Sequence, residues 1–194
     1  SEYQATVEAW GNTEAVASII PSAEDWLHKG INRSLKLTLS QSHAEPIKLY
    51  EALLKANALS MLNFDLSQQD KTHVPISGNV GWLDFTHALT FSNAVRKQCA
   101  KYPELWPQGL LQITCFSGRN ANFATQDYDV DTWCGDDPLA EIEEILEQAF
   151  DHGLGEYIVS VHWLKTALAV RDEMNEFSGD VRRALLASVK RFVS

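Results

Sequence analysis

The sequence lacks several features that identify a protein's class at once. No apolar run approaches the roughly 20 residues of a membrane-spanning helix, and the start lacks the basic-then-apolar pattern of a signal peptide. A phosphate-binding glycine loop, a G-x-G-x-x-G turn and a G-x-S-x-G nucleophile motif are also absent. We therefore expect a cytoplasmic protein without a membrane partner and without the usual nucleotide or hydrolase sites.

Cysteine is scarce and its spacing is uninformative. Cys99, Cys115 and Cys134 are an odd number, form no C-x-x-C pair and do not lie beside a histidine as zinc ligands do. We interpret them as reduced thiols, which agrees with a cytoplasmic location.

Basic residues are the minority, with 16 Lys and Arg against 26 Asp and Glu and a net charge of -10. The excess comes from one segment, residues 120–164, which holds eleven acids and no Lys or Arg. Such a surface repels nucleic acid, so we expect no nucleic-acid partner. An acidic segment suits a basic protein partner instead.

What the chain does have is helical periodicity along most of its length. Its 194 residues fit one domain, and apolar side chains recur every three or four residues in several segments. The segments are approximately 22–35, 46–61, 82–101, 107–118, 138–153, 157–176 and 178–192. We predict a compact all-α bundle of about seven helices over residues 1–194, with a loop at 65–80 and an acidic loop and helix at 120–164.

A short internal repeat is the most specific signal. The pattern H-x-L-x4-A-V-R occurs at residues 87–96 and again at 162–171, inside two predicted helices. The alanines would let the two helices pack closely and bring His87 and His162 together in a pseudo-twofold arrangement. Asp84, three residues before His87, would share its face and orient its imidazole.

Histidines on facing helices of a bundle commonly bind a metal, a cofactor or the polar part of a ligand. We therefore take His87, His162 and Asp84 as candidate catalytic groups, and His87, His162 and His152 as candidate ligands should a metal ion be the cofactor. A di-iron centre is disfavoured, because it needs two E-x-x-H motifs. The alternative is that these histidines are buried, bonded to neighbouring turns and without a site.

Several other residues are candidates for ligand binding. Trp82, Phe91 and Trp163 flank the histidines and would line an aromatic pocket, whereas aromatic core is the alternative. Arg119 would bind an anionic group or the carbonyls at a helix end. The Asp-x-Asp-x-Asp run at 127–131 departs from a calcium loop, because Thr132 and Pro138 replace the required Gly and Glu.

Three stretches resemble the questin oxidase-like family. They are E-P-I-K-L-Y-E-A-L-L-K-A-N-A (45–58), G-W-L-D-F-T-H-A-L-T-F-S-N-A-V-R (81–96) and V-H-W-L-K-T-A-L-A-V (161–170). Family members are mostly helical and act in oxidative ring opening of anthraquinones, so the resemblance implies an oxidoreductase. A similar helical segment accompanies Rieske-type iron–sulfur proteins. The C-x-H…C-x-x-H ligand pair is absent here, so that second resemblance implies a redox centre elsewhere.

Two functions follow as expectations. In the first, a soluble helical protein binds a small apolar or aromatic molecule in a histidine-lined pocket inside the bundle, with an oxidoreductase role implied by the resemblance. In the second, the chain is a non-catalytic helical module whose acidic face docks a basic partner or a redox protein.

Overall fold

A computed structural model describes residues 7–10, 19–71, 73–76, 78–150, 153 and 155–194. Over these residues the chain forms helices and no strand, which confirms the all-α prediction. The helices are α2 (Ile31–Ser40), α3 (Pro46–Leu62), α4 (Trp82–Cys99), α5 (Trp106–Asn120), α6 (Val130–Trp133), α7 (Pro138–Phe150), α8 (Tyr157–Glu176) and α9 (Gly179–Val193). Single 3-10 turns span Ala23–Asp25, Leu66–Gln68 and Pro103–Leu105.

Proline sets most of the predicted helix boundaries. Pro46 and Pro138 open α3 and α7, and Pro107 lies in the first turn of α5, where the missing N–H has no intrahelical acceptor to lose. α4 ends at Cys99, shortly before Pro103. These boundaries agree with the periodicity to within a few residues.

The first predicted helix, residues 22–35, is divided in two. The backbone N–H of Ser22 donates to Asp25 Oδ2 at 3.0 Å, but this cap opens only one 3-10 turn. His28 then adopts a left-handed conformation with φ 61°, and α2 starts anew after Gly30. Trp26 holds the two parts together, since it is fully buried and its indole N–H donates to Thr38 Oγ1 at 3.0 Å.

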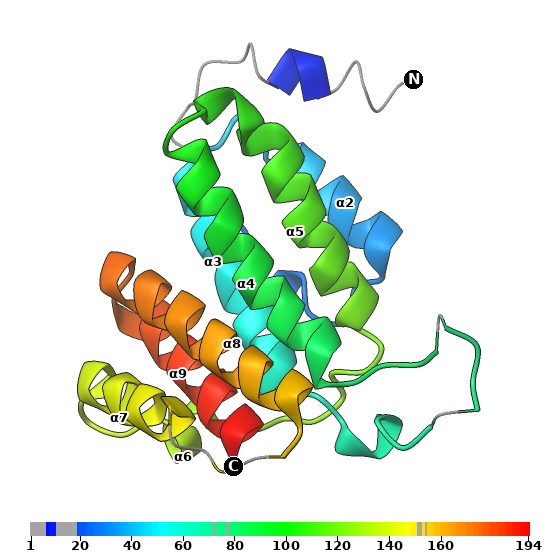
Figure 1. Cartoon of the computed structure of the whole chain (residues 1–194). Coiled ribbons are helices and arrows are strands. Elements are labelled where there is room, and N and C mark those ends of the chain that lie inside the picture. The colour runs from blue at the N-terminus through cyan, green and yellow to red at the C-terminus, as the bar shows by residue number, and fades with distance from the viewer. Residues whose placement is uncertain (1–6, 11–18, 72, 77, 151–152, 154) are drawn as a thin grey trace.

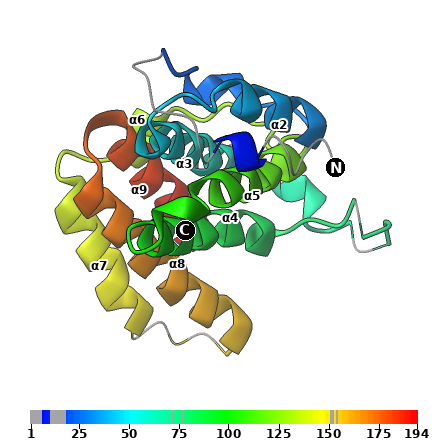
Figure 2. The same ribbon diagram turned by 90° about the horizontal axis from the view of Figure 1, so that it is seen from above.

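The central helix of the bundle is α3. It packs against α4, α5 and α9, and every residue from Ala56 to Leu62 is buried (Figure 1). A helix that is enclosed on all sides belongs in the middle of a core. α2 covers α5 on one side and α7 covers α8 on the other, so these two helices lie at opposite edges of the molecule (Figure 2).

A buried arginine ties the end of α3 to α9. Arg191 is 6% exposed, and its guanidinium donates to the carbonyl oxygens of Leu62 and Phe64. Trp82 and Tyr128 face the same cation, with ring centroids 5.3 and 4.4 Å from it. The carbonyls at a helix C-terminus have no intrahelical donors, so Arg191 caps α3 from a neighbouring helix.

Helices α2 and α5 approach so closely that only glycine fits between them. A Cβ atom at Gly118 would lie 2.5 Å from the Cα atom of Ile31, a backbone atom that cannot rotate away. A Cβ atom at Gly30, on the other side of the same approach, would meet nothing within 4 Å.

Replacing Gly118 with alanine should therefore destabilise the protein. We expect the free energy of unfolding in urea to fall by about 1–3 kcal/mol through overpacking, although alanine favours helix by about 1 kcal/mol. Gly30→Ala is the matched control and should cost under about 1 kcal/mol, through a poorer N-cap alone. Equal or higher stability of Gly118→Ala would contradict the close approach.

Candidate functional site

The two helices that carry the repeat pack side by side and run in the same direction (Figure 1). His87 Nε2 on α4 lies 3.1 Å from His162 Nε2 on α8. Further along, Lys97 forms an ion pair with Asp172. Both pairs join residues 75 apart in the sequence, which is the offset of the repeat. The two histidines of the repeat therefore face each other across the contact between α4 and α8, and the same offset continues to Lys97 and Asp172, the first residues after the repeat.

The two histidines of the repeat are related by a local pseudo-twofold axis between α4 and α8. The two arginines of the repeat are not, because they have different partners. Arg96 binds Glu173 on α8, whereas Arg171 lies 3.6 Å from Glu143 on α7.

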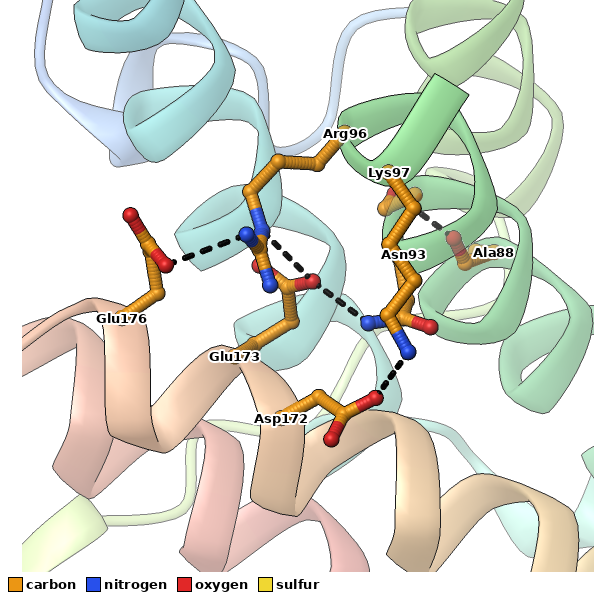
Figure 3. A network of polar contacts seen from close by, with 8 residues as sticks. Ala88, Asn93, Arg96, Lys97, Asp172, Glu173 and Glu176 are labelled. Atoms are coloured by element: carbon orange, nitrogen blue, oxygen red, sulfur yellow. Dashed lines mark hydrogen bonds and ion pairs between the residues drawn. The ribbon is translucent and has the colours of Figure 1, made fainter. Parts of the chain in front are cut away.

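A buried carboxylate holds α8 against α4. Glu173 is 1% exposed and accepts hydrogen bonds from Asn93 Nδ2 at 2.7 Å and from Arg96 Nε at 2.9 and 3.0 Å (Figure 3). Arg96 also donates to Glu176 at 3.1 Å. Burial and the negative charge of Glu173 raise the pKa of nearby Tyr50 well above its ordinary value, so this phenol stays neutral.

The partners of the two imidazoles define which nitrogens carry protons. His162 Nδ1 lies 2.7 Å from the carbonyl oxygen of Ile158. A carbonyl only accepts hydrogen bonds, so we assign the proton of neutral His162 to Nδ1 and a lone pair to Nε2. His87 then donates its Nε2–H to that lone pair. Its own Nδ1 has no hydrogen-bond partner among the described residues and presents a second lone pair.

The surroundings of His87 favour its neutral form. Partial burial of the imidazole lowers the pKa of His87, the positive charges of Lys165 and of protonated His162 lower it further, and the carboxylate of Asp84 opposes them. The hydrogen bond to His162 fits this form, since neutral His87 protonated at Nε2 donates to the Nε2 lone pair of His162.

An open groove of about 650 Å³ runs from His87 along α4 and α8 to their far halves. Its apolar floor contains Phe91, Phe116 and Leu168, and the first two rings lie 5.3 Å apart. The prediction of a pocket inside the bundle is wrong, because His87 itself is exposed and the groove lies at the surface.

The rim of the groove carries more positive than negative charge. Lys97, Lys165 and Arg171 line it together with one carboxylate, Asp172. Lys97 pairs with Asp172 and Arg171 with Glu143. Within the described part of the chain, Lys165 forms no ion pair, so its charge is available to a ligand.

Asp84 does not orient His87, contrary to the expectation. One carboxylate oxygen accepts the backbone N–H of Gly81 at 3.0 Å and so caps the start of α4. The other oxygen lies 3.9 Å from the guanidinium of Arg119. The Asp84 carboxylate thus binds a free backbone N–H at the start of α4 and not the imidazole of His87. The residue that orients His87 is His162.

Of the aromatic candidates only Phe91 lies in the groove. Trp82 packs against Phe64 and Phe192, with ring centroids 5.1 and 5.3 Å apart, and Trp163 is half-buried against the core. The expectation that these tryptophans line the site is therefore wrong. Arg119 does not line this groove either.

Arg119 is held by a neighbouring loop. It donates to the carbonyl oxygen of Asn79 at 3.1 Å and lies over the ring of Phe123, 5.0 Å from its centroid. It lines a separate groove of about 640 Å³ with Arg33 and His28. Arg119 therefore binds a carbonyl of a loop and lies near the carboxylate of Asp84, and it does not bind the carbonyls at the end of its own helix.

The remaining ligand candidates are few. His152 lies outside the described residues, and no group of three or more His, Cys, Asp or Glu within them is arranged for a metal ion. Burial raises the pKa values of all three cysteine thiols, and that of Cys99 reaches about 11 with the help of Glu104. A raised pKa disfavours the thiolate, so none of them is a suitable nucleophile.

The acidic segment is partly neutralised from within the chain. Asp131 lies 2.6 Å from Arg183, Glu141 lies 2.5 Å from Lys190, and Glu143 pairs with Arg171. These pairs reduce the charge that the segment offers to a basic partner.

The sequence interpretation missed Lys165, Leu168 and Phe116. The first could have been found, since His162, Lys165, Ala169 and Asp172 follow a 3-4-3 spacing that puts them on one face of α8. Phe116 comes from α5, and nothing in the sequence pairs it with Phe91.

Comparisons with protein-family models, with curated proteins and with solved structures find no match for this chain. None of the helices in the described ranges has both the length and the apolarity needed to cross a bilayer.

Removing the buried carboxylate should disrupt the pairing of α4 with α8. We expect Glu173→Ala to lower the free energy of unfolding by about 3–5 kcal/mol, because the largely buried Arg96 loses its buried partner and keeps only the exposed Glu176. Glu176→Ala is the matched control, since the 52% exposed Glu176 binds the same arginine and should cost under about 1 kcal/mol. Similar losses for both variants in urea denaturation would contradict this account.

Histidine 87 should also make stability depend on pH. Because its pKa is lower in the folded state, the unfolded chain binds its proton first as the pH falls through the usual histidine range. Stability conferred by neutral His87 is therefore present above that range and is lost toward the lower, folded-state pKa. Wild type should lose more stability between pH 7.5 and 5.5 than His87→Gln does.

The control for that measurement is His43→Gln, which alters an exposed histidine on the turn between α2 and α3. It should keep the wild-type pH dependence in urea denaturation. If His87→Gln and wild type lose equal stability over this range, the neutral His87 assignment is wrong.

Proposed function

We propose that the groove along α4 and α8 binds a small apolar or aromatic molecule that carries an anionic group. One observation supports this most directly: an aromatic floor lies under a rim with three cations and one carboxylate. Sites for small molecules typically combine an apolar lining with a few polar groups that fix orientation. An aromatic or apolar carboxylate satisfies both parts of this groove.

The floor and the rim have separate roles in this proposal. Phe91, Phe116 and Leu168 supply apolar contact, and burying an aromatic ring against such side chains stabilises a complex by about 1.5–3 kcal/mol. Lys165 supplies the charge for the anionic end, since Lys97 and Arg171 already have carboxylate partners.

His87 is the residue proposed for proton transfer. It lines the groove, and the hydrogen bond from its Nε2–H to His162 leaves the Nδ1 lone pair as a base. His162 is a positioning residue, held in turn by the Ile158 carbonyl. An oxidoreductase role is proposed from the questin oxidase-like resemblance alone, with a redox group supplied by a cofactor or partner.

The binding proposal is tested with two matched probes, 2-naphthoate and neutral 2-naphthol. We expect naphthoate to bind more tightly in calorimetry, because only it has the negative charge for Lys165. Phe91→Ala should weaken both probes by about 10-fold or more through lost apolar contact. Lys165→Gln should weaken naphthoate alone, by about 2–5-fold, as expected for one exposed charge pair.

Lys101→Gln provides the control, since it removes an exposed lysine that does not line the groove. It should leave both affinities unchanged. Equal binding of the two probes to wild type and to Phe91→Ala would show that they bind elsewhere and would reject the groove.

A further inference from the structure

The two imidazoles of the site point their Nε2 atoms at one another. The ring centroids are 5.1 Å apart, whereas the Nε2 atoms are 3.1 Å apart, so both nitrogens lie on the inner side of their rings. The ring planes are inclined by 62°. Both helices are held in this register by the Glu173 network, so the pair is built into the helix contact and is not a chance approach of two loose side chains.

This spacing is also that of two nitrogen ligands on one metal ion. Imidazole nitrogens bind Zn²⁺ at about 2.0–2.1 Å, so two nitrogens 3.1 Å apart subtend roughly 100° at a shared ion. That angle lies between the values for square-planar and tetrahedral coordination. We propose that His87 and His162 bind one divalent transition-metal ion through their Nε2 atoms, with Cu²⁺ bound more tightly than Ni²⁺ or Zn²⁺.

The hydrogen bonds around the pair suit a metal ion. The Nδ1–H of His162 donates to the Ile158 carbonyl, the outer contact that metal-binding histidines usually make, and this leaves Nε2 free to coordinate. In its neutral form His87 can bind by moving its proton from Nε2 to Nδ1, without any net loss of a proton. The ion thus takes the place of the hydrogen bond between the rings.

The surroundings set the strength and the openness of the site. The charge of Asp84 attracts a cation and that of Lys165 opposes it, since both act on His87. No third protein ligand comes from the described residues, so water or a groove ligand must complete the coordination. We therefore expect an exchangeable ion with open positions toward the groove. This inference does not depend on the proposed aromatic ligand.

The test is calorimetric titration of the full chain with Cu²⁺ and with Ni²⁺ at pH 7.5. One site is expected, and His87→Ala and His162→Ala should each weaken it by more than 10-fold. His43→Ala removes an exposed histidine elsewhere and should change the affinity by less than 2-fold.

A measurement on the unaltered protein guards against variants that fold poorly. Electron paramagnetic resonance of the wild-type Cu²⁺ complex should show two equivalent imidazole nitrogens. The proposal is overturned if the spectrum shows fewer than two, or if the double variant His87→Ala/His162→Ala binds either ion as tightly as wild type.

Discussion

One buried carboxylate sets the arrangement of the whole site. An ion taken out of water is costly unless it is paired and fully hydrogen-bonded, so Glu173 must lie opposite Asn93 and Arg96. This requirement fixes how far α8 can slide along α4. His87 and His162 lie about two to three turns closer to the N-termini of α4 and α8 than the Glu173 network does. The same register of the two helices brings their imidazoles to hydrogen-bonding distance. The histidine contact is therefore a consequence of a salt bridge that lies outside the site.

The same constraint explains why two basic groups can face each other at the surface. Two protonated imidazoles at this distance would repel, and the helices cannot separate to relieve them without exposing the Glu173 network. The pair is stable only when a proton, or a metal ion, lies between two lone pairs. Because the Ile158 carbonyl assigns the proton of His162, the tautomer of His87 follows, and the open Nδ1 of His87 becomes the outward end of the chain of bonds.

The sequence predicted the contact between the histidines because the repeat encodes both the helix face and the offset of 75 residues. The sequence did not predict that His87 is exposed. Helical periodicity shows which residues share a face of a helix, but it does not show how much of that face a neighbouring helix covers. Trp82 was misplaced because five residues before His87 is about 140° around a helix. Asp84 was misplaced because the free N–H groups at the start of α4 compete for a nearby carboxylate. The break at His28 was missed because the left-handed residue is itself neither glycine nor asparagine, and Gly30, two residues on, was the only mark of it.

The net charge of the chain is negative, whereas the charge at the rim of the groove is positive. The two coexist because charges that are far apart in water are screened from one another. Acidic residues dominate the composition, yet Glu141 and Glu143 are engaged by Lys190 and Arg171. Charges in water beyond about 8–10 Å are screened at physiological salt, so a ligand in the groove responds to the side chains at its rim and hardly to the net charge. An excess of local cations over an aromatic floor can therefore select an anion on a protein that repels anions overall. The net charge of -10 thus describes the long-range field of the whole molecule, whereas the side chains at the rim set the local field of the groove.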